Sequence, residues 1–285
     1  MFFKFIILKK AKYFFFSKLF WCLFTKELIV IKLGGSVITD KTKPFSIRIN
    51  TIEELSKEIY EISKNGYEII IVHGGGSFGH PIAKKFNVNE GYKNEIGLKG
   101  FIETIQAMRE LNKKIVEILN KNNVNSIGFP ASTIFITDKD SIISANLEPI
   151  IFSLNMKIIP VLCGDAVFNK SKGYSILSGD KICSYLSIHL KASKLIFTLD
   201  VDGILSFEND KPRLLKELNM NNLYSIKFKK SENIDVTGGI IYKLEEAFQI
   251  AEKGIKVFFV NGLIPGRIKK AIFEEDFYGT KISIK

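Results

Sequence analysis

The first segment that could do chemistry joins a lysine to two glycines. Residues 32–36 read Lys-Leu-Gly-Gly-Ser, and Lys41 follows in a Thr-Asp-Lys run. Glycines let the chain turn with its N–H groups directed at an anion, because no side chain obstructs the approach. Lys32, at the end of an apolar run, can reach the same anion as a point charge. An ordinary turn with surface lysines has the same pattern, so this segment alone indicates only a candidate phosphate site.

A second glycine loop carries a histidine at each end. Residues 73–80 read His-Gly-Gly-Gly-Ser-Phe-Gly-His, and glycines between a strand and a helix form an anion cradle at the helix N-terminus. His80 can hydrogen-bond a phosphate oxygen, whereas His73, directly after a buried strand, is expected to be structural. The Gly-x-Gly-x-x-Gly spacing also fits a dinucleotide-binding fold. We reject that interpretation because the position about 20 residues on falls at Asn94-Glu95, where no strand ends.

Carboxylates accompany two further predicted elements. Asp180, in a Ser-Gly-Asp run, opens a helix, where it could cap backbone donors or hold lysine side chains around a transferring phosphate. Residues 198–203 read Thr-Leu-Asp-Val-Asp-Gly. Asp200 and Asp202 could ligate a metal there, although a strand-end Asp-x-Asp-Gly is also a common turn.

The last candidate segment is a glycine pair followed by a lysine. Residues 237–243 read Thr-Gly-Gly-Ile-Ile-Tyr-Lys, and we expect the glycines to begin a helix with Lys243 one turn inside it. The sequence contains no Gly-x-x-x-x-Gly-Lys-Ser/Thr, which excludes the P-loop class of kinases.

The elements that must position these segments follow from the hydrophobic pattern. Short apolar runs alternate with amphipathic stretches from Glu27 onward, as is typical of a mostly parallel α/β sheet. In such sheets ligands bind at the carboxyl ends of the strands. We expect one sheet with two functional halves that meet near residues 170–180. Strands are expected at 28–33, 68–73, 157–163, 195–199 and 256–260, and helices at 52–66, 101–118, 181–190 and 244–251.

Composition narrows the class of protein. With 285 residues and 46% hydrophobic content, the chain can form a substantial core. The three cysteines, Cys22, Cys163 and Cys183, form no C-x-x-C pair, which favours free thiols in a reducing cytoplasm. The three histidines are too scattered for a metal cluster, so we expect no protein-bound metal.

Residues 1–26 differ from the rest of the chain. They hold six lysines, no acidic residue and eight of the 24 phenylalanines, so they supply +6 of the net charge of +11. The longest uncharged run, Leu19–Thr25, is too short to span a bilayer, and no A-x-A-like cleavage site is present. A basic helix on a membrane surface would fit, but we favour a translated leader outside the fold. The remaining +5 suits anionic substrates without requiring nucleic acid.

Taken together and in this order, the four segments resemble the amino acid kinase superfamily over residues 27–285. Within it, Lys-Leu-Gly-Gly-Ser-Val-Ile-Thr-Asp-Lys at 32–41 and Val-His-Gly-Gly-Gly-Ser-Phe-Gly-His at 72–80 are similar to the isopentenyl phosphate kinase family. The resemblance implies a three-layer αβα sandwich around a mostly parallel sheet, and a cytoplasmic homodimer. It implies ATP and Mg²⁺ as cofactors and isopentenyl phosphate, from isoprenoid biosynthesis, as the acceptor. Residues 27–175 would form the acceptor-phosphate-binding half and residues 176–285 the ATP-binding half.

The resemblance also implies a role for each candidate residue. Lys32 and Lys243 would hold the ATP phosphates, Lys41 would neutralise the transferring group, and Asp180 would orient the lysines. With His80, these are the expected catalytic residues. Contacts to the acceptor are expected from Gly75, His80 and Gly164. Contacts to ATP are expected from Lys32, Gly34, Gly35, Ser36, Gly76, Asp180, Asp200, Asp202, Gly203, Gly239 and Lys243. Mg²⁺ would arrive with ATP, without a protein ligand. The five-carbon tail would lie between helix 99–120 and residues 127–136.

Three alternatives remain open at this point, one of which is nucleic-acid binding through the basic residues 1–26, which would be lost on their removal. A kinase of the same architecture could act on another phosphate or phosphonate, such as fosfomycin, which an acceptor screen would reveal. A nucleotide-binding module without chemistry would lack Lys32, Lys41, Asp180 or Lys243, and the sequence contains all four.

Overall fold

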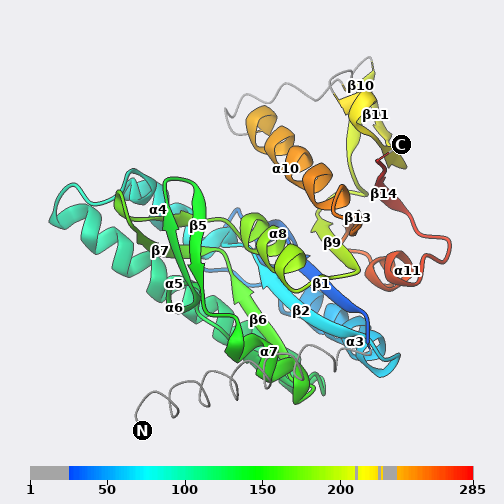
Figure 1. Ribbon diagram of the computed structural model, residues 1–285, viewed down its shortest axis with the longest axis horizontal. Helices are drawn as coiled ribbons and strands as arrows, with labels where there is room; N and C mark the ends of the chain where they lie inside the picture. The colour runs from blue at the N-terminus through cyan, green and yellow to red at the C-terminus, as the bar shows by residue number, and fades with distance from the viewer. Residues whose placement is uncertain (1–25, 209–210, 224–225, 227–235, 285) are drawn as a thin grey trace, which may run out of the picture.

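A central sheet of eight strands organises the molecule (Figure 1). The computed structural model describes residues 26–208, 211–223, 226 and 236–284, so the predicted leader lies outside the described residues except for Lys26. The strand order is β12-β14-β13-β9-β1-β2-β6-β3, and all neighbouring pairs are parallel except β13 with β14. The predicted α/β class with a mostly parallel sheet is therefore confirmed.

The inner strands of the sheet are apolar on both faces. All six residues of β1 are buried, because helices cover both faces of a parallel sheet. The strands are β1 (Leu28–Leu33), β2 (Glu68–His73), β3 (Ser126–Gly128), β6 (Ile159–Cys163), β9 (Lys194–Leu199), β12 (Glu217–Leu218), β13 (Lys256–Asn261) and β14 (Gly279–Ile282).

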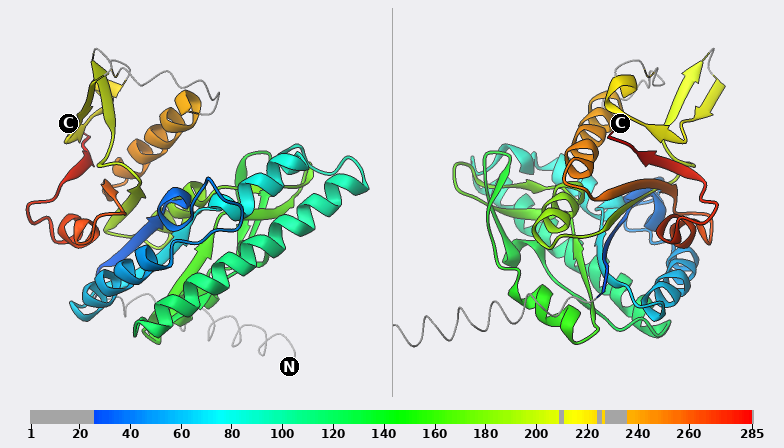
Figure 2. Two further views of the ribbon diagram at one scale, coloured as in Figure 1. Left: turned by 180° about the vertical axis from the view of Figure 1, so that it is seen from behind. Right: turned by 45° about the vertical axis from the view of Figure 1, so that its right-hand side comes forward.

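Helices form a layer on each side of the sheet, as Figure 2 shows. One layer contains α7 (Glu148–Asn155), α8 (Gly179–His189) and α10 (Val236–Ala251), and the other contains α3 (Ile49–Lys64), α5 (Glu95–Lys121) and α11 (Arg267–Phe273). Successive residues of a strand face opposite sides. Accordingly, Val30 packs in the core under the first layer, whereas Ile29 and Ile31 pack in the core under the second.

Short helices continue the chain directly after the strands. They include α2 (Gly35–Ile38) after β1 and α4 (Gly76–Lys85) after β2, which η1 (Val88–Glu90) follows. Two more, α6 (Ala131–Ile134) and α9 (Met220–Leu223), lie in later connections. Since α2 and α4 begin at the carboxyl edge of the sheet, the glycines before them also lie at that edge.

The expectation of one sheet was wrong. The described residues form two further sheets: β5-β4-β7-β8, and the hairpin β10 (Leu205–Glu208) with β11 (Lys211–Leu214). The first comprises β4 (Phe135–Asp138), β5 (Ser141–Ala145), β7 (Asp165–Asn169) and β8 (Gly173–Leu177). These strands are short and partly exposed, so they lack the continuous apolar run that marks a buried strand. The predicted division at 175/176 falls inside β8.

Candidate active site

A carboxylate bridges two lysines from distant parts of the chain. Lys32 lies near the end of β1, Asp180 in the first turn of α8, and Lys243 inside α10. Lys32 Nζ is 2.7 Å from Asp180 Oδ1, and Lys243 Nζ is 3.2 Å from Asp180 Oδ2. Three separate sequence segments therefore converge on one cluster. Lys243 is about two turns into its helix, not one, because α10 begins before the glycine pair.

The electrostatics of this cluster reflect its burial. The side chains of Lys32, Asp180 and Lys243 are 10%, 20% and 18% exposed. Burial acts to raise the pKa of the Asp180 carboxyl, but the two lysines outweigh it and lower that pKa to about 2. Burial opposes the charge of Lys32, yet Asp180 raises its pKa overall, whereas burial and repulsion from Lys32 lower the pKa of Lys243. One carboxylate thus serves two ammonium groups, which leaves a positive charge for an anion.

Glycine loops on neighbouring strands approach each other too closely for side chains. A Cβ on Gly35 would lie 2.6 Å from Gly76 N, and one on Gly164 would lie 2.6 Å from Gly179 N. Gly76 has a φ of +47°, and a Cβ there would overlap Thr39 Oγ1. The loops after β1 and β2 are therefore interlocked, and the loop after β6 is in equally close contact with the start of α8.

A cavity of about 160 Å³ lies beside the cluster. Its polar wall includes Lys32, Asp180 and His80, and its apolar wall includes Met108 and Ile176. The complete lining is Lys32, Gly74, Gly75, Gly79, His80, Ala83, Thr104, Met108, Gly164, Asp165, Ile176, Leu177, Ser178, Gly179 and Asp180. The cavity therefore contains the three predicted acceptor residues and joins a cationic end to an apolar wall.

The other predicted residues do not line this cavity. Lys41 is exposed on the loop between α2 and α3, and no ion pair of the described residues involves it. Gly34 N donates to Thr198 Oγ1 at 3.0 Å, which joins the first loop to β9. Asp200 is exposed after β9, and Asp202 Oδ1 accepts from Asn261 Nδ2 at 3.2 Å. Ser36 is half-buried in α2, Gly203 is buried with a φ of +151°, and Gly239 lies in α10.

Sequence reasoning missed several residues of the cavity wall. Thr104 and Met108 come from α5, Ile176 from β8, and Asp165 directly follows Gly164. Residues 127–136, which were expected to form the tail pocket with α5, do not line this cavity. Gly128 and Pro130 line a separate cavity together with residues of α5, so the place of the tail stays a prediction. Of the two roles left open for Asp180, the structure supports the one in which it holds lysine side chains, because the Ser178 side chain caps α8 by accepting from Lys181 N.

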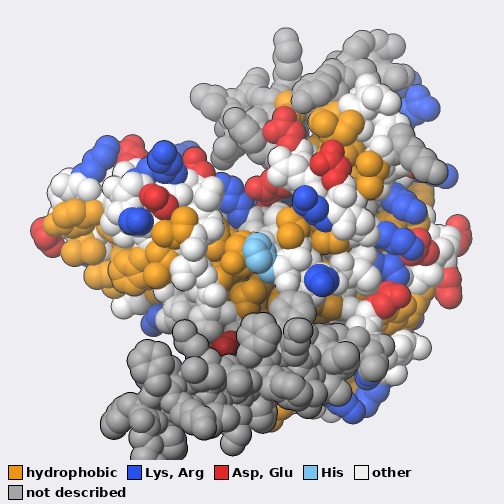
Figure 3. Space-filling model, viewed as in Figure 1, with side chains coloured by type: hydrophobic (Ala, Val, Ile, Leu, Met, Phe, Trp, Pro, Cys, Tyr) orange, Lys and Arg blue, Asp and Glu red, His pale blue; other side chains and the backbone are white. Residues whose placement is uncertain are grey.

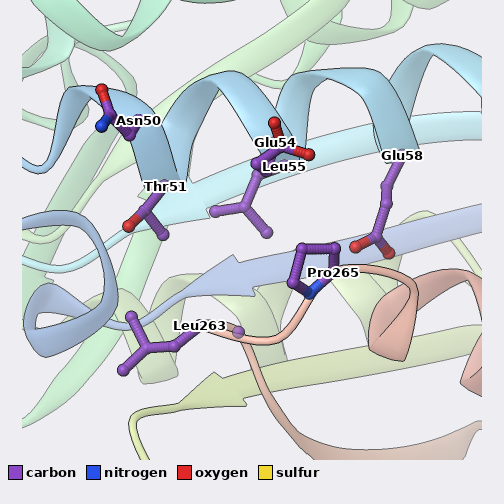
Figure 4. Close-up of a pocket in the computed structure, with 8 residues that line it drawn as sticks. Asn50, Thr51, Glu54, Leu55, Glu58, Leu263 and Pro265 are labelled. Atoms are coloured by element: carbon purple, nitrogen blue, oxygen red, sulfur yellow. The ribbon is translucent and has the colours of Figure 1, made fainter.

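Another cavity, of about 170 Å³, lies between α3 and the segment after β13 (Figure 4). None of the predicted site residues lines it. The side chains that carry charge there are Glu54 and Glu58. The Glu58 carboxylate already accepts from Gly266 N and Lys269 N at the start of α11. An acidic cavity without a cation does not suit a phosphate.

Hydrophobic side chains also gather on the outer surface. In Figure 3 they cover much of the region of α4, α5 and the four-stranded sheet. Ile136, Ile143 and Phe168 on that sheet are 46%, 52% and 56% exposed.

Within the described ranges, no group of three or more His, Cys, Asp or Glu side chains could hold a metal ion. No helix among the residues described is long and apolar enough to cross a membrane.

Fold and site together define a phosphotransferase of the amino acid kinase type. Residues 27–261 match the profile described as "Amino acid kinase family", and the chain belongs to that family. Within it, the chain is 36% identical to isopentenyl phosphate kinase of Methanocaldococcus jannaschii, over 90% of this chain and 98% of the relative. It is 32% identical to the enzyme of the same name from Methanothermobacter thermautotrophicus, over 90% and 100%. A crystal structure of isopentenyl phosphate kinase superposes with a TM-score of 0.77 at 28% identity, covering 90% and 100% of the two chains.

Proposed function

We propose that this protein transfers the γ-phosphoryl group of ATP to isopentenyl phosphate, giving isopentenyl diphosphate and ADP. The observation that carries the proposal is the cavity that combines Gly75 and His80 at one wall with Met108 and Ile176 at another. A phosphate head with a short apolar tail fits that combination. The names of the relatives that are 36% and 32% identical support the same acceptor.

The reaction requires positioning more than acid–base chemistry. The nucleophile is an oxygen of the acceptor phosphate, which is already ionised at neutral pH, so no strong general base is needed. Asp180 would hold the ammonium groups of Lys32 and Lys243 against the ATP phosphates, consistent with its contacts to both. Lys41 would approach from its exposed loop and neutralise the transferring group.

The remaining site residues are proposed to divide between the two substrates. Gly75, His80 and Gly164 would contact the acceptor phosphate, because all three line the cavity. The proposed nucleotide contacts are Gly34, Gly35, Ser36, Gly76, Asp200, Asp202, Gly203 and Gly239. Mg²⁺ would arrive with ATP and neutralise its phosphates. The acceptor would thus bind mainly to residues 27–175, and the nucleotide mainly to residues 176–285.

We further propose a cytoplasmic homodimer. The exposed side chains of Ile136, Ile143 and Phe168 give it physical support, since a subunit contact would remove them from water. Sedimentation equilibrium would measure the subunit number, and a monomer at micromolar concentration would contradict the proposal.

An acceptor screen tests the catalytic proposal. The protein is incubated with Mg²⁺-ATP and, separately, isopentenyl phosphate, fosfomycin, acetylglutamate and UMP, and products are identified by ³¹P NMR. Isopentenyl diphosphate should form with a kcat/KM at least a hundredfold above that of any other acceptor. Preferential phosphorylation of fosfomycin would move the assignment to a phosphonate kinase, and ATP binding without turnover of any acceptor would indicate a non-catalytic module.

A further inference from the structure

A chain of hydrogen bonds runs under the second glycine loop. Asn112 Nδ2, on α5, lies 3.1 Å from Val161 O and 3.1 Å from His73 Nε2. His73 Nδ1 lies 3.0 Å from Gly74 O. The His73 side chain is completely buried and Asn112 is 8% exposed, so this chain is shielded from water. The histidine is structurally satisfied, as the sequence predicted, but its second partner belongs to the glycine loop.

The partners at the two ends of the chain determine the position of its protons. Val161 O only accepts, so the Asn112 atom beside it must be the amide nitrogen, which has two hydrogens to donate. The second hydrogen goes to His73 Nε2, which must then be unprotonated. Gly74 O also only accepts, so Nδ1 carries the hydrogen. Burial lowers the pKa of His73 to about 4, in spite of the bond to Gly74, which keeps the imidazole neutral.

This bond sets the direction of one peptide group. The Gly74–Gly75 peptide is trans, like every described peptide bond, and in a trans peptide the C=O and N–H point in opposite directions. With the Gly74 carbonyl directed at the buried imidazole, the Gly75 N–H points away from it. Gly75 lines the cavity, and a Cβ there would lie 3.3 Å from His80 Cδ2.

We infer that His73 is a positioning residue, whose Nδ1–H tautomer turns the Gly74–Gly75 peptide so that the Gly75 N–H donates to an anionic group of the acceptor. Glycine needs such a restraint, because a Gly-Gly-Gly loop has more accessible backbone conformations than any other sequence. Asn112 acts indirectly, because its amide group selects the Nδ1–H tautomer of His73. The inference deepens the proposed function, since it concerns the acceptor phosphate of that reaction.

Two substitutions of His73 separate positioning from general structure. An asparagine amide nitrogen falls near the place of Nδ1, and a glutamine amide nitrogen near that of Nε2. His73→Asn should therefore retain the bond to Gly74, and His73→Gln should lose it. We expect His73→Gln to raise the KM for isopentenyl phosphate at least tenfold while the Kd for ATP changes less than twofold. For His73→Asn, the KM for isopentenyl phosphate and the Kd for ATP should both stay within threefold of the values for the unsubstituted protein. Equal KM values in the two variants would overturn the inference.

A matched control and a ligand-free measurement complete the test. His189→Gln changes a histidine at the end of α8 outside the cavity and should leave both constants unchanged. Titration of inorganic phosphate at saturating ADP should show a matching loss of phosphate affinity in His73→Gln. This result is expected even if isopentenyl phosphate proves not to be the acceptor. In the unsubstituted protein, ¹⁵N-histidine NMR at neutral pH should show a protonated Nδ1 and an unprotonated Nε2 for His73. The opposite tautomer, or an imidazolium, would overturn the inference without relying on any variant.

Discussion

At the scale of single residues, Lys41 and Lys243 differ in their surroundings. Lys243 is paired with Asp180 inside the site, whereas Lys41 lies on an exposed loop. A charge that acts only in the transition state affects kcat, and one that also acts on bound substrate affects affinity. Lys41→Ala should therefore lower kcat by about 10²–10³-fold with nearly unchanged ATP affinity, and Lys243→Ala should weaken ATP binding as well.

Direct ATP titration of both variants, alongside steady-state kinetics, tests this division. Lys99→Ala, on the exposed surface of α5, is a suitable control for loss of one positive charge. If Lys41→Ala abolishes ATP binding while Lys243→Ala binds normally, the assignment of the two halves is wrong.

Asp165 belongs to the same scale and predicts a pH effect on stability. It is 2% exposed, its Oδ1 accepts from Ala166 N at 2.8 Å, and burial raises its pKa to about 7. Between the unfolded pKa near 4 and the folded value, the folded state holds a proton that the unfolded state has lost. Stability from this group therefore falls as pH rises through that window, by at most about 4 kcal/mol. Asp165→Asn should match the unsubstituted protein near pH 4 and be more stable at pH 8.

Thermal unfolding across pH 4–8 provides the measurement. Asp138 is a control of opposite sign, because its hydrogen bond from Ser171 lowers its pKa. Asp138→Asn should remove a small stabilisation that is present at neutral pH and disappears in acid. A gain from Asp165→Asn that is the same at every pH would contradict the burial argument.

At the scale of elements, the contact between the first two glycine loops is the feature most sensitive to change. A methyl group at Gly35 would push on the backbone of Gly76, and overpacking of this kind costs about 1–3 kcal/mol. Gly35→Ala should therefore reduce stability and also raise KM for both substrates, since it separates the loops after β1 and β2.

Gly66→Ala is the matched control for that change. Gly66 has a φ of +90° and open space around it, so alanine should cost about 1–2 kcal/mol through backbone strain alone. We expect Gly66→Ala to lower the melting temperature with unchanged kinetics. Unchanged KM values in Gly35→Ala would show that the loops can separate without affecting the site.

The same elements show what could be predicted from sequence. The bounds of β1 and β2 were predicted correctly, because each is a mostly apolar run followed by glycine. The strands of the small sheet were missed because β5, for example, contains no buried residue. The start of α10 was placed two residues too late, at Gly238-Gly239, because glycine is a poor helix former and was expected at the end of the helix, not inside it. For the site, the glycine and lysine segments were recognised, but Met108 was not, because helical periodicity cannot separate a core side chain from a cavity wall.

At the scale of the whole molecule, the fold is expected to stand without the basic aromatic leader. The family match begins at residue 27 and β1 begins at Leu28. Deleting residues 1–26 should leave kcat/KM within twofold and the melting temperature nearly unchanged. An insoluble or several-fold less active product would show that the leader packs on the domain.

A slightly longer deletion provides the comparison. Glu27 Oε2 lies 3.6 Å from Nζ of the buried Lys194 side chain, at the start of β9. Removing residues 1–27 should therefore lower the melting temperature relative to removing residues 1–26, because one partner of a largely buried ammonium group is lost.

The direction of β1 has a practical consequence for handling the protein. The strand enters the sheet at Leu28 and carries Lys32 to the opposite edge, about 13 Å away at the usual rise per residue. If a covalent linker ahead of residue 27 attaches the protein to a solid support, the active site would therefore face away from that support. Immobilised in that orientation on a bead or electrode, the protein should exchange substrate and product with flowing buffer as freely as it does in solution.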